Sequence, residues 1–187
     1  SCTAVVTAAS VSDLDANDPP DTMAADVTAT FAVSGGITPI SAVQGSGETS
    51  PLNNQIVTIE GIVVGDYEGA QPALRGFYVQ SRDADADDDP ATSEGLFVFN
   101  GNNNSVSLGD EVRVTGTVGE FEGQTQLSSV TGIDVVSSGN AVTPAVVEMP
   151  FASLTEPERW EGMLVTFEQE LSVTEYFQLG RLGELVL

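Results

Sequence analysis

Short runs of alternating hydrophobic and polar residues dominate the chain, and turn-forming residues separate them. The clearest runs, rich in Val, Ile, Thr and Phe, lie at residues 4–10, 27–33, 55–66, 76–80, 95–99, 110–118, 124–130 and 133–136. Such alternation puts successive side chains on opposite faces and is typical of β-strands. No long stretch has a clean helical period, so we expect helix only as a turn or two near residues 155–160. The pattern predicts an all-β fold.

The longest of these runs, residues 55–66, carries Gly61 in its middle. A residue without a side chain lets a strand bend sharply, and a long bent first strand is typical of small closed barrels. Several further strands follow before residue 143. We therefore expect residues 53–143 to form a small OB-like Greek-key β-barrel.

The segments on either side of this barrel predict less complete structures. Residues 1–35 hold two strands joined by an acidic loop. Residues 144–187 either begin another β-unit or extend the barrel, with a strand expected at 182–187. Two strands alone are marginally stable in water, so both flanking β-units are incomplete. Residues 36–52 carry Gly, Ser and Pro and are expected to be a linker.

Acidic residues outnumber basic ones by 28 to five, and the net charge is −23 with no Lys and no His. Nucleic-acid affinity comes largely from Lys and Arg, so direct nucleic-acid binding is not expected. The absence of His also excludes Ser-His-Asp and Cys-His catalysis, and the absence of Lys excludes Walker-type phosphate binding. The carboxylates cluster in turns, where solvation is the expected state, so we predict no catalytic residues.

Two further observations limit how the chain is stabilised. Cys2 is the single cysteine, so an internal disulfide is excluded. No apolar run reaches about 18 residues, which predicts that the chain has no membrane-spanning helix. Strong acidity suits calcium, a salty environment or simple solubility, and a bound metal is one way to stabilise such a fold.

The most distinctive motif is the acidic loop at residues 83–94. Its candidate ligands occupy positions one, three, five, seven and twelve, as in an EF-type calcium loop, and are Asp83, Asp85, Asp87, Asp89 and Glu94. Asp88 stands where an EF loop requires Gly, and the flanks are strands rather than helices. The pattern predicts an EF-like Ca²⁺ loop in a β-hairpin, or alternatively a solvated acidic turn. Mutual repulsion of the carboxylates favours the metal.

A second acidic loop lies between the first two predicted strands. Its possible ligands are Asp13, Asp15, Asn17, Asp18 and Asp21. Two prolines stiffen this loop, but it has no acidic residue at the twelfth position. Calcium binding and an ordinary Asx-rich surface turn both remain open here.

Aromatic residues lie on or beside the predicted barrel strands. Tyr67 and Phe121 are the candidates for a platform on which sugars or bases stack. The competing interpretation is that the rings fill the core, because alternate positions of a half-buried strand must do so.

Several sequence blocks, taken together, resemble a known domain. The blocks are residues 40–47, 57–63, 76–80, 83–94, 109–116, 125–127 and 161–165. In this order they resemble the OB-fold-like domain of large secreted bacterial nucleases, which precedes an endonuclease/exonuclease/phosphatase catalytic domain. Residues 1–35 look like the last strands of a bacterial Ig-like domain. The loop at 83–94 matches an Asp-rich turn of that family, whereas the lack of Lys departs from it.

The resemblance implies a bacterial protein that is extracellular or on the cell surface, with a catalytic domain downstream as its partner. On this view the chain is a non-catalytic, calcium-stabilised accessory module that positions or spaces that domain. Two alternatives remain. One is a structural module that assembles head to tail with neighbouring copies of itself by β-strand addition. The other is a glycan-binding, adhesin-like barrel.

Overall fold

The structure is a computed structural model, and it describes residues 2–10, 25–31, 36–70, 73–182 and 186. The chain divides into two compact units, Ser1–Gly36 and Ile37–Leu187. Each unit is described separately below.

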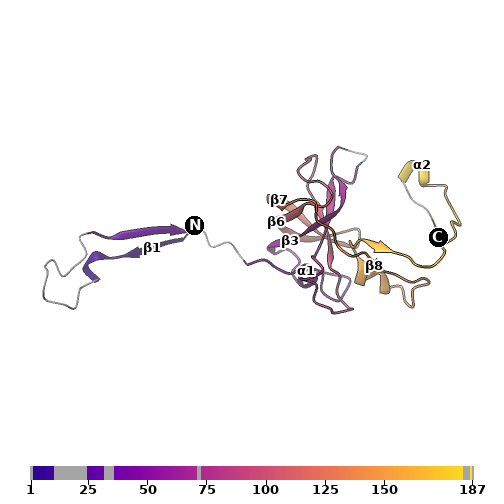
Figure 1. Ribbon diagram of the computed structural model, residues 1–187, viewed down its shortest axis with the longest axis horizontal. Helices are drawn as coiled ribbons and strands as arrows, with labels where there is room; N and C mark the ends of the chain where they lie inside the picture. Colours follow the sequence, from indigo (N-terminus) through magenta and orange to yellow (C-terminus); the bar gives the residue numbers. More distant parts are fainter. Residues whose placement is uncertain (1, 11–24, 32–35, 71–72, 183–185, 187) are drawn as a thin grey trace. The chain divides into compact units, whose positions relative to one another are not determined.

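The first unit contains strands β1 (Cys2–Val6) and β2 (Val27–Phe31), which pair antiparallel with Cys2 opposite Phe31 (Figure 1). The strand expected at residues 4–10 is shorter than predicted. It ends at Val6 and is followed by a 3-10 turn, η1 (Ala8–Ser10). The Ala8 backbone N–H donates to Asp26 Oδ1 at 2.7 Å. The Ala8 N–H is therefore not available for a backbone hydrogen bond to a neighbouring strand, as it would be if β1 continued.

The second unit contains a closed barrel of five strands. These are β3 (Ile56–Tyr67), β4 (Gly76–Gln80), β5 (Gly95–Phe99), β6 (Glu111–Phe121) and β7 (Gln124–Ser137). The strand order around the barrel is β3-β4-β5-β7-β6. Every pairing is antiparallel except β5 with β7, which is parallel. The predicted all-β fold with a small OB-like Greek-key barrel is confirmed.

Strand β3 pairs with two different neighbours along its length. It pairs with β6 from Ile56 to Ile62 and with β4 from Ile62 onward. A Cβ atom at Gly61 would lie 2.6 Å from the Gln80 carbonyl oxygen, so no side chain fits there. The missing side chain therefore lets β3 approach β4 closely enough to close the barrel.

Alternate strand positions fill the interior of the barrel, as the sequence pattern predicted. The fully enclosed side chains are apolar and come from every strand: Ile59, Val63, Phe77, Val79, Leu96, Val98, Val112, Val114, Val118 and Leu127. Burying a large apolar side chain contributes about 1.5–3 kcal/mol relative to leaving it exposed. Packing of these side chains is therefore the main favourable contribution to the stability of the barrel.

The segment expected to be a linker instead contains a buried helix, α1 (Ile40–Gln44). Its Ile40 and Val43 side chains join the hydrophobic core. The Gln44 side-chain Nε2 donates to the Gly95 carbonyl oxygen at 2.6 Å, which ties the helix to β5. A helix of five residues is too short to show a helical period in the sequence and depends on tertiary packing for its stability. The interpretation of this part of residues 36–52 as a linker was therefore wrong.

Strand β7 is one continuous strand where the sequence predicted two, at residues 124–130 and 133–136. Ser129 has a positive φ of 48° inside it. The pairing with β6 shifts register between Thr115 and Thr117. The irregularity interrupts the alternation of side chains without ending the strand.

The last part of the second unit holds the short parallel pair β8 (Ala145–Val146) and β9 (Val165–Thr166). The 3-10 turn η2 (Glu156–Trp160) between them confirms the helical turn predicted near residues 155–160. Of the strand expected at residues 182–187, only Leu182 and Val186 are among the described residues, and the rest of that prediction lies outside them. Leu182 ends α2 (Leu179–Leu182), and Val186 makes an isolated bridge to Glu175.

No helix among the described residues combines the length and the apolar character needed to span a lipid bilayer. Head-to-tail assembly through β1–β2 or β8–β9 stays a prediction.

Candidate functional site

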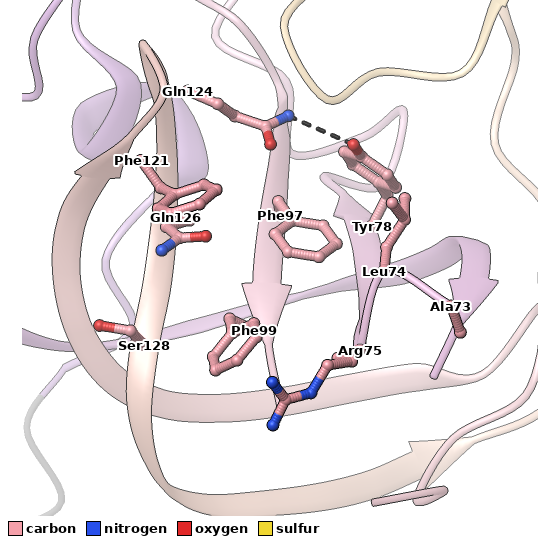
Figure 2. A pocket seen from close by; sticks show the side chains of 10 residues that line it. All are labelled: Ala73, Leu74, Arg75, Tyr78, Phe97, Phe99, Phe121, Gln124, Gln126 and Ser128. Atoms are coloured by element: carbon pink, nitrogen blue, oxygen red, sulfur yellow. Dashed lines mark hydrogen bonds between the residues drawn. The ribbon is translucent and has the colours of Figure 1, made fainter. Parts of the chain in front are cut away.

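A groove with a volume of about 620 Å³ lies against strands β4, β5 and β7 (Figure 2). Four aromatic side chains line it: Tyr78, Phe97, Phe99 and Phe121. Its polar lining comes from Arg75, Gln124, Gln126 and Ser128. The groove is therefore mainly apolar, with a small number of hydrogen-bonding groups, as is usual for sites that bind organic ligands.

The strand register sets the rings side by side. Tyr78 of β4 is opposite Phe97 of β5, and Phe97 is opposite Gln126 of β7. The neighbours of Phe97 along its strand, Leu96 and Val98, are fully buried in the barrel, so Phe97 and Phe99 face the groove. The Tyr78 and Phe97 ring centroids lie 4.9 Å apart. Strand alternation thus places aromatic rings on the groove side of the strands, with Phe97 at its base, only 6% exposed.

Gly76 makes room for this surface. A Cβ atom at Gly76 would lie 2.5 Å from Cζ of Phe97 and 2.2 Å from the Val98 carbonyl oxygen. The Phe97 ring therefore occupies the space that a side chain at Gly76 would need. This close approach is a tertiary reason for a glycine at the first position of β4.

Polar groups at the edge of the groove are held in place by contacts with the rings. The Gln124 Nε2 atom donates to the Tyr78 hydroxyl at 3.3 Å (Figure 2). The Arg75 guanidinium carbon lies 5.2 Å from the centroid of the Phe99 ring. The buried Nε of Arg75 has no hydrogen-bond partner among the described residues. A donor in this state is available to an oxygen atom of a ligand.

The two aromatic residues predicted for stacking occupy different places. Phe121 lines the groove and is 62% exposed. Tyr67 does not line it, and its ring packs edge-on against Tyr78 with centroids 6.0 Å apart. Stacking of a ligand on either ring stays a prediction.

The sequence did not single out Arg75, Gln124, Gln126 or Ser128 as site residues. The alternation along residues 124–128 marks Gln124, Gln126 and Ser128 as outward positions, but only the parallel pairing of β5 with β7 places them beside Phe97. Arg75 carries no such signal, because it precedes the strand.

The acidic loop at residues 83–94 connects β4 to β5. The Asp83 carboxylate accepts hydrogen bonds from the Thr143 hydroxyl at 2.6 Å and the Thr143 backbone N–H at 3.0 Å. These bonds hold the pKa of Asp83 below its usual value. The Asp85 carboxylate pairs with Arg82 Nε at 2.5 Å. The first two candidate ligands thus bind groups at the margin of the loop.

The other three candidate ligands form bonds within the loop. Asp87 Oδ1 accepts from the Asp89 N–H at 2.8 Å, and Asp89 Oδ1 accepts from the Ala91 N–H at 2.9 Å. Glu94 Oε1 accepts from the Asp87 N–H at 2.9 Å. Within the described ranges, no group of three or more acidic, His or Cys side chains forms a metal site. Calcium binding by this loop stays a prediction.

The candidate ligands of the other acidic loop lie outside the described residues. These are Asp13, Asp15, Asn17, Asp18 and Asp21.

Glu161 connects the C-terminal segment to the barrel between the groove and the acidic loop. Its Oε1 accepts from the Thr125 N–H at 2.8 Å, and its carbonyl oxygen accepts from the Ser93 hydroxyl at 2.6 Å. Burial, assisted by the nearby carboxylates of Glu158 and Glu120, raises the pKa of Glu161 to about 7, although the hydrogen bonds from Thr125 and Gln44 act to lower it. Glu161 is therefore a carboxyl group that titrates near neutral pH.

Comparison with known proteins adds no assignment to this geometry. No family model matches the chain, and no curated protein matches it. The chemistry of the groove and of the acidic loop therefore carries the functional argument.

Proposed function

We propose that this chain is a non-catalytic binding module of a secreted protein, and that its aromatic groove binds an uncharged oligosaccharide. The observation that carries the proposal is the set of four rings on the groove, flanked by the amide side chains of Gln124 and Gln126. Aromatic rings stack on the apolar faces of sugar rings, and amides bind sugar hydroxyl groups. The corresponding face of OB-folds binds oligosaccharides and oligonucleotides.

Charge favours the sugar over the nucleic acid. The chain carries a net charge of −23, and Arg75 is the basic residue among those that line the groove. A phosphate backbone needs several basic side chains to replace its counterions, whereas a neutral sugar needs none. The Arg75 Nε, which has no partner within the part of the chain that the structure describes, then serves as a donor to a single hydroxyl or ring oxygen.

The test is isothermal titration calorimetry of the 187-residue chain with neutral β-linked and α-linked oligosaccharides, and with a single-stranded oligonucleotide of matched length. We expect saturable binding of at least one sugar and none of the oligonucleotide. Phe121→Ala should weaken sugar binding about tenfold, because loss of one stacking contact costs about 1–3 kcal/mol. Because Phe121 is largely exposed, this substitution should leave the fold intact.

Phe177→Ala is the matched control. Phe177 is 82% exposed and does not line the groove, so the same substitution there should not change binding. Tyr67→Ala tests the residue that supports Tyr78 from outside the groove and should have a smaller effect than Phe121→Ala. Absence of binding to every sugar tested, or equal losses of sugar affinity in Phe121→Ala and Phe177→Ala, would reject the proposal.

A second candidate is an accessory module that positions the catalytic domain of an extracellular nuclease. The OB-like barrel supports it, because four of the blocks that carry the resemblance lie in or overlap barrel strands β3, β4, β6 and β7: residues 57–63, 76–80, 109–116 and 125–127. The coding sequence that follows Leu187 provides the test. A His-bearing nuclease domain there supports this role, and its absence rejects it. If the domain is present, the nuclease activity of the Phe121→Ala variant of the whole polypeptide distinguishes the two roles. A spacer role predicts unchanged activity, whereas a binding role predicts a change.

A further inference from the structure

Glu94 is the most enclosed carboxylate of the acidic loop. The residue is 9% exposed, whereas the aspartates of the loop are exposed. Its Oε1 accepts the hydrogen bond from Asp87, but its Oε2 is buried and has no hydrogen-bond partner among the described residues. Leaving a carboxylate oxygen both desolvated and unpartnered is costly. Its surroundings therefore favour a bound positive charge.

Asp87 lies beside Glu94. Its backbone N–H donates to Glu94 Oε1 at 2.9 Å, and its Oδ1 accepts from the Asp89 N–H at 2.8 Å and from the Thr92 hydroxyl at 3.2 Å. The Asp87 and Glu94 side chains also line the same cavity. Two adjacent carboxylates repel unless a proton or a cation lies between them.

These groups surround a cavity of about 230 Å³. Its lining includes the oxygen-bearing side chains of Asp87, Asp88, Asp89, Thr92 and Glu94, together with Arg159 and Trp160. The volume accommodates an ion together with several water molecules. Carboxylate and hydroxyl oxygens are the ligands that Ca²⁺ prefers, and its flexible coordination tolerates an irregular set that Mg²⁺ does not.

We propose that Asp87 and Glu94 bind one Ca²⁺ ion in this cavity, with Oε2 of Glu94 as the buried ligand and water completing the coordination. This site differs from the EF-like arrangement predicted from the sequence, because Asp83 and Asp85 take no part in it. Their carboxylates bind Thr143 and Arg82 instead. The proposal does not depend on the proposed function, since none of its ligands lines the aromatic groove.

The experiment uses the 187-residue chain, freed of metal by a chelator and dialysed. Calorimetric titration with CaCl₂ alone should show saturable binding with a Kd of about 0.1–1 mM, the range of extracellular calcium modules. Because the ion binds only the native state, 10 mM CaCl₂ should raise the Tm by about 3 °C or more. MgCl₂ at the same concentration should bind more weakly and raise the Tm less. No saturable heat, or the same shift in NaCl of equal ionic strength, overturns the proposal.

Glu94→Gln and Asp87→Asn should each weaken Ca²⁺ binding at least tenfold. The matched controls are Asp83→Asn and Asp85→Asn, which remove the same charge from the same loop but should change the Kd less than threefold. Equal losses in all four variants would overturn the proposal in favour of non-specific attraction or the EF-like arrangement.

Glu94→Gln also separates a bound cation from a shared proton. The Gln amide can donate to Asp87 as a protonated Glu94 would, but it cannot replace a metal ligand of negative charge. If a proton occupies the site, the variant keeps the wild-type Tm and the wild-type Tm does not respond to Ca²⁺. That result would overturn the proposal.

Arg159 provides an independent check on the sign of the ligand's charge. Its guanidinium carbon lies 4.6 Å from the Trp160 ring centroid, and its positive charge opposes a cation in the cavity. Arg159→Gln should therefore tighten Ca²⁺ binding about two- to threefold, as expected for the loss of a partly screened like charge. Weaker binding in this variant would contradict a cation site.

Discussion

The aromatic groove and the acidic loop both depend on strands β4 and β5, yet they are built in different ways. In the groove, strand pairing decides which side chains are neighbours, as for Tyr78 opposite Phe97. In the loop, the hydrogen-bond partners of the carboxylates do not follow from strand pairing, as for Asp83, which binds Thr143. Regular structure thus makes neighbours predictable, whereas a loop distributes similar side chains among dissimilar partners.

Energetic consequences follow from this difference. Groove residues are extensions of the packed barrel, and a change beneath them disturbs the core. Most loop carboxylates are exposed and their contacts are screened by water, so individual changes there should cost little. Glu94 is the exception, because it begins the return to β5 and is buried. The predictions below test this contrast, starting with the largest expected effect.

Gly76→Ala should be strongly destabilising. The new Cβ would lie 2.2 Å from the Val98 carbonyl oxygen and 2.5 Å from the Phe97 ring, so both the core and the groove must shift. We expect the free energy of unfolding to fall by about 3 kcal/mol, measured by chemical denaturation. Gly119→Ala in β6 is the control, because no atom lies within 4 Å of its new Cβ. Its effect should stay within about 0.5 kcal/mol. Similar losses in both variants would contradict the packing argument.

Glu161→Gln should change how stability depends on pH. The pKa of Glu161 is about 7 in the folded protein and 4.5 as its ordinary value, so folding favours the protonated form. Its contribution to the free energy of unfolding is therefore complete below pH 4.5 and is lost as the pH rises through 7. The Gln side chain keeps an acceptor for the Thr125 N–H without the charge.

We expect Glu161→Gln to be more stable than the wild type at pH 8 by about 1 kcal/mol, a value reduced for solvent screening of a partly exposed group. The difference between the two proteins should shrink toward pH 4.5. The measurement is urea denaturation at several pH values between 4.5 and 8. A difference that does not vary with pH would show that Glu161 does not titrate in this range.

Asp85→Ala should have the smallest effect. Its ion pair with Arg82 is exposed, and Arg82 keeps Glu111 as a second partner at 2.5 Å. The free energy of unfolding should change by less than about 0.5 kcal/mol, and 1 M NaCl should remove even that difference. A loss of several kcal/mol in thermal denaturation would show that the loop is built around Asp85, against the contrast drawn above.

Most of the barrel could be predicted from the sequence, because the alternation of Val, Ile and Phe is strong and local. Strands β4 and β5 lie at the predicted residues, and the missing side chain of Gly61 leaves room for the Gln80 carbonyl oxygen. Helix α1 could not be predicted, since five residues have too little periodicity and the helix depends on burial of Ile40 and Val43 in the core. Strand β7 was divided in two because its irregular register interrupts the pattern.

The candidate site was predicted less completely than the fold. The sequence identified Phe121 as an exposed ring and the acidic loop as a candidate for calcium. It could not show that Tyr67 lies outside the groove, that Arg75 lies on Phe99, or that Glu94 alone among the loop acids is buried. Each of these depends on contacts between residues that are distant in the sequence or on the direction in which a loop turns.

The sequence by itself determined the period of the strands, the closed barrel and the strongly acidic surface, because side-chain alternation and charge are local properties of the chain. The tertiary structure decided which rings share one groove and which carboxylate faces a cavity. Those outcomes depend on strand order and on partners such as Thr143 and Arg82, whose positions the local pattern does not contain.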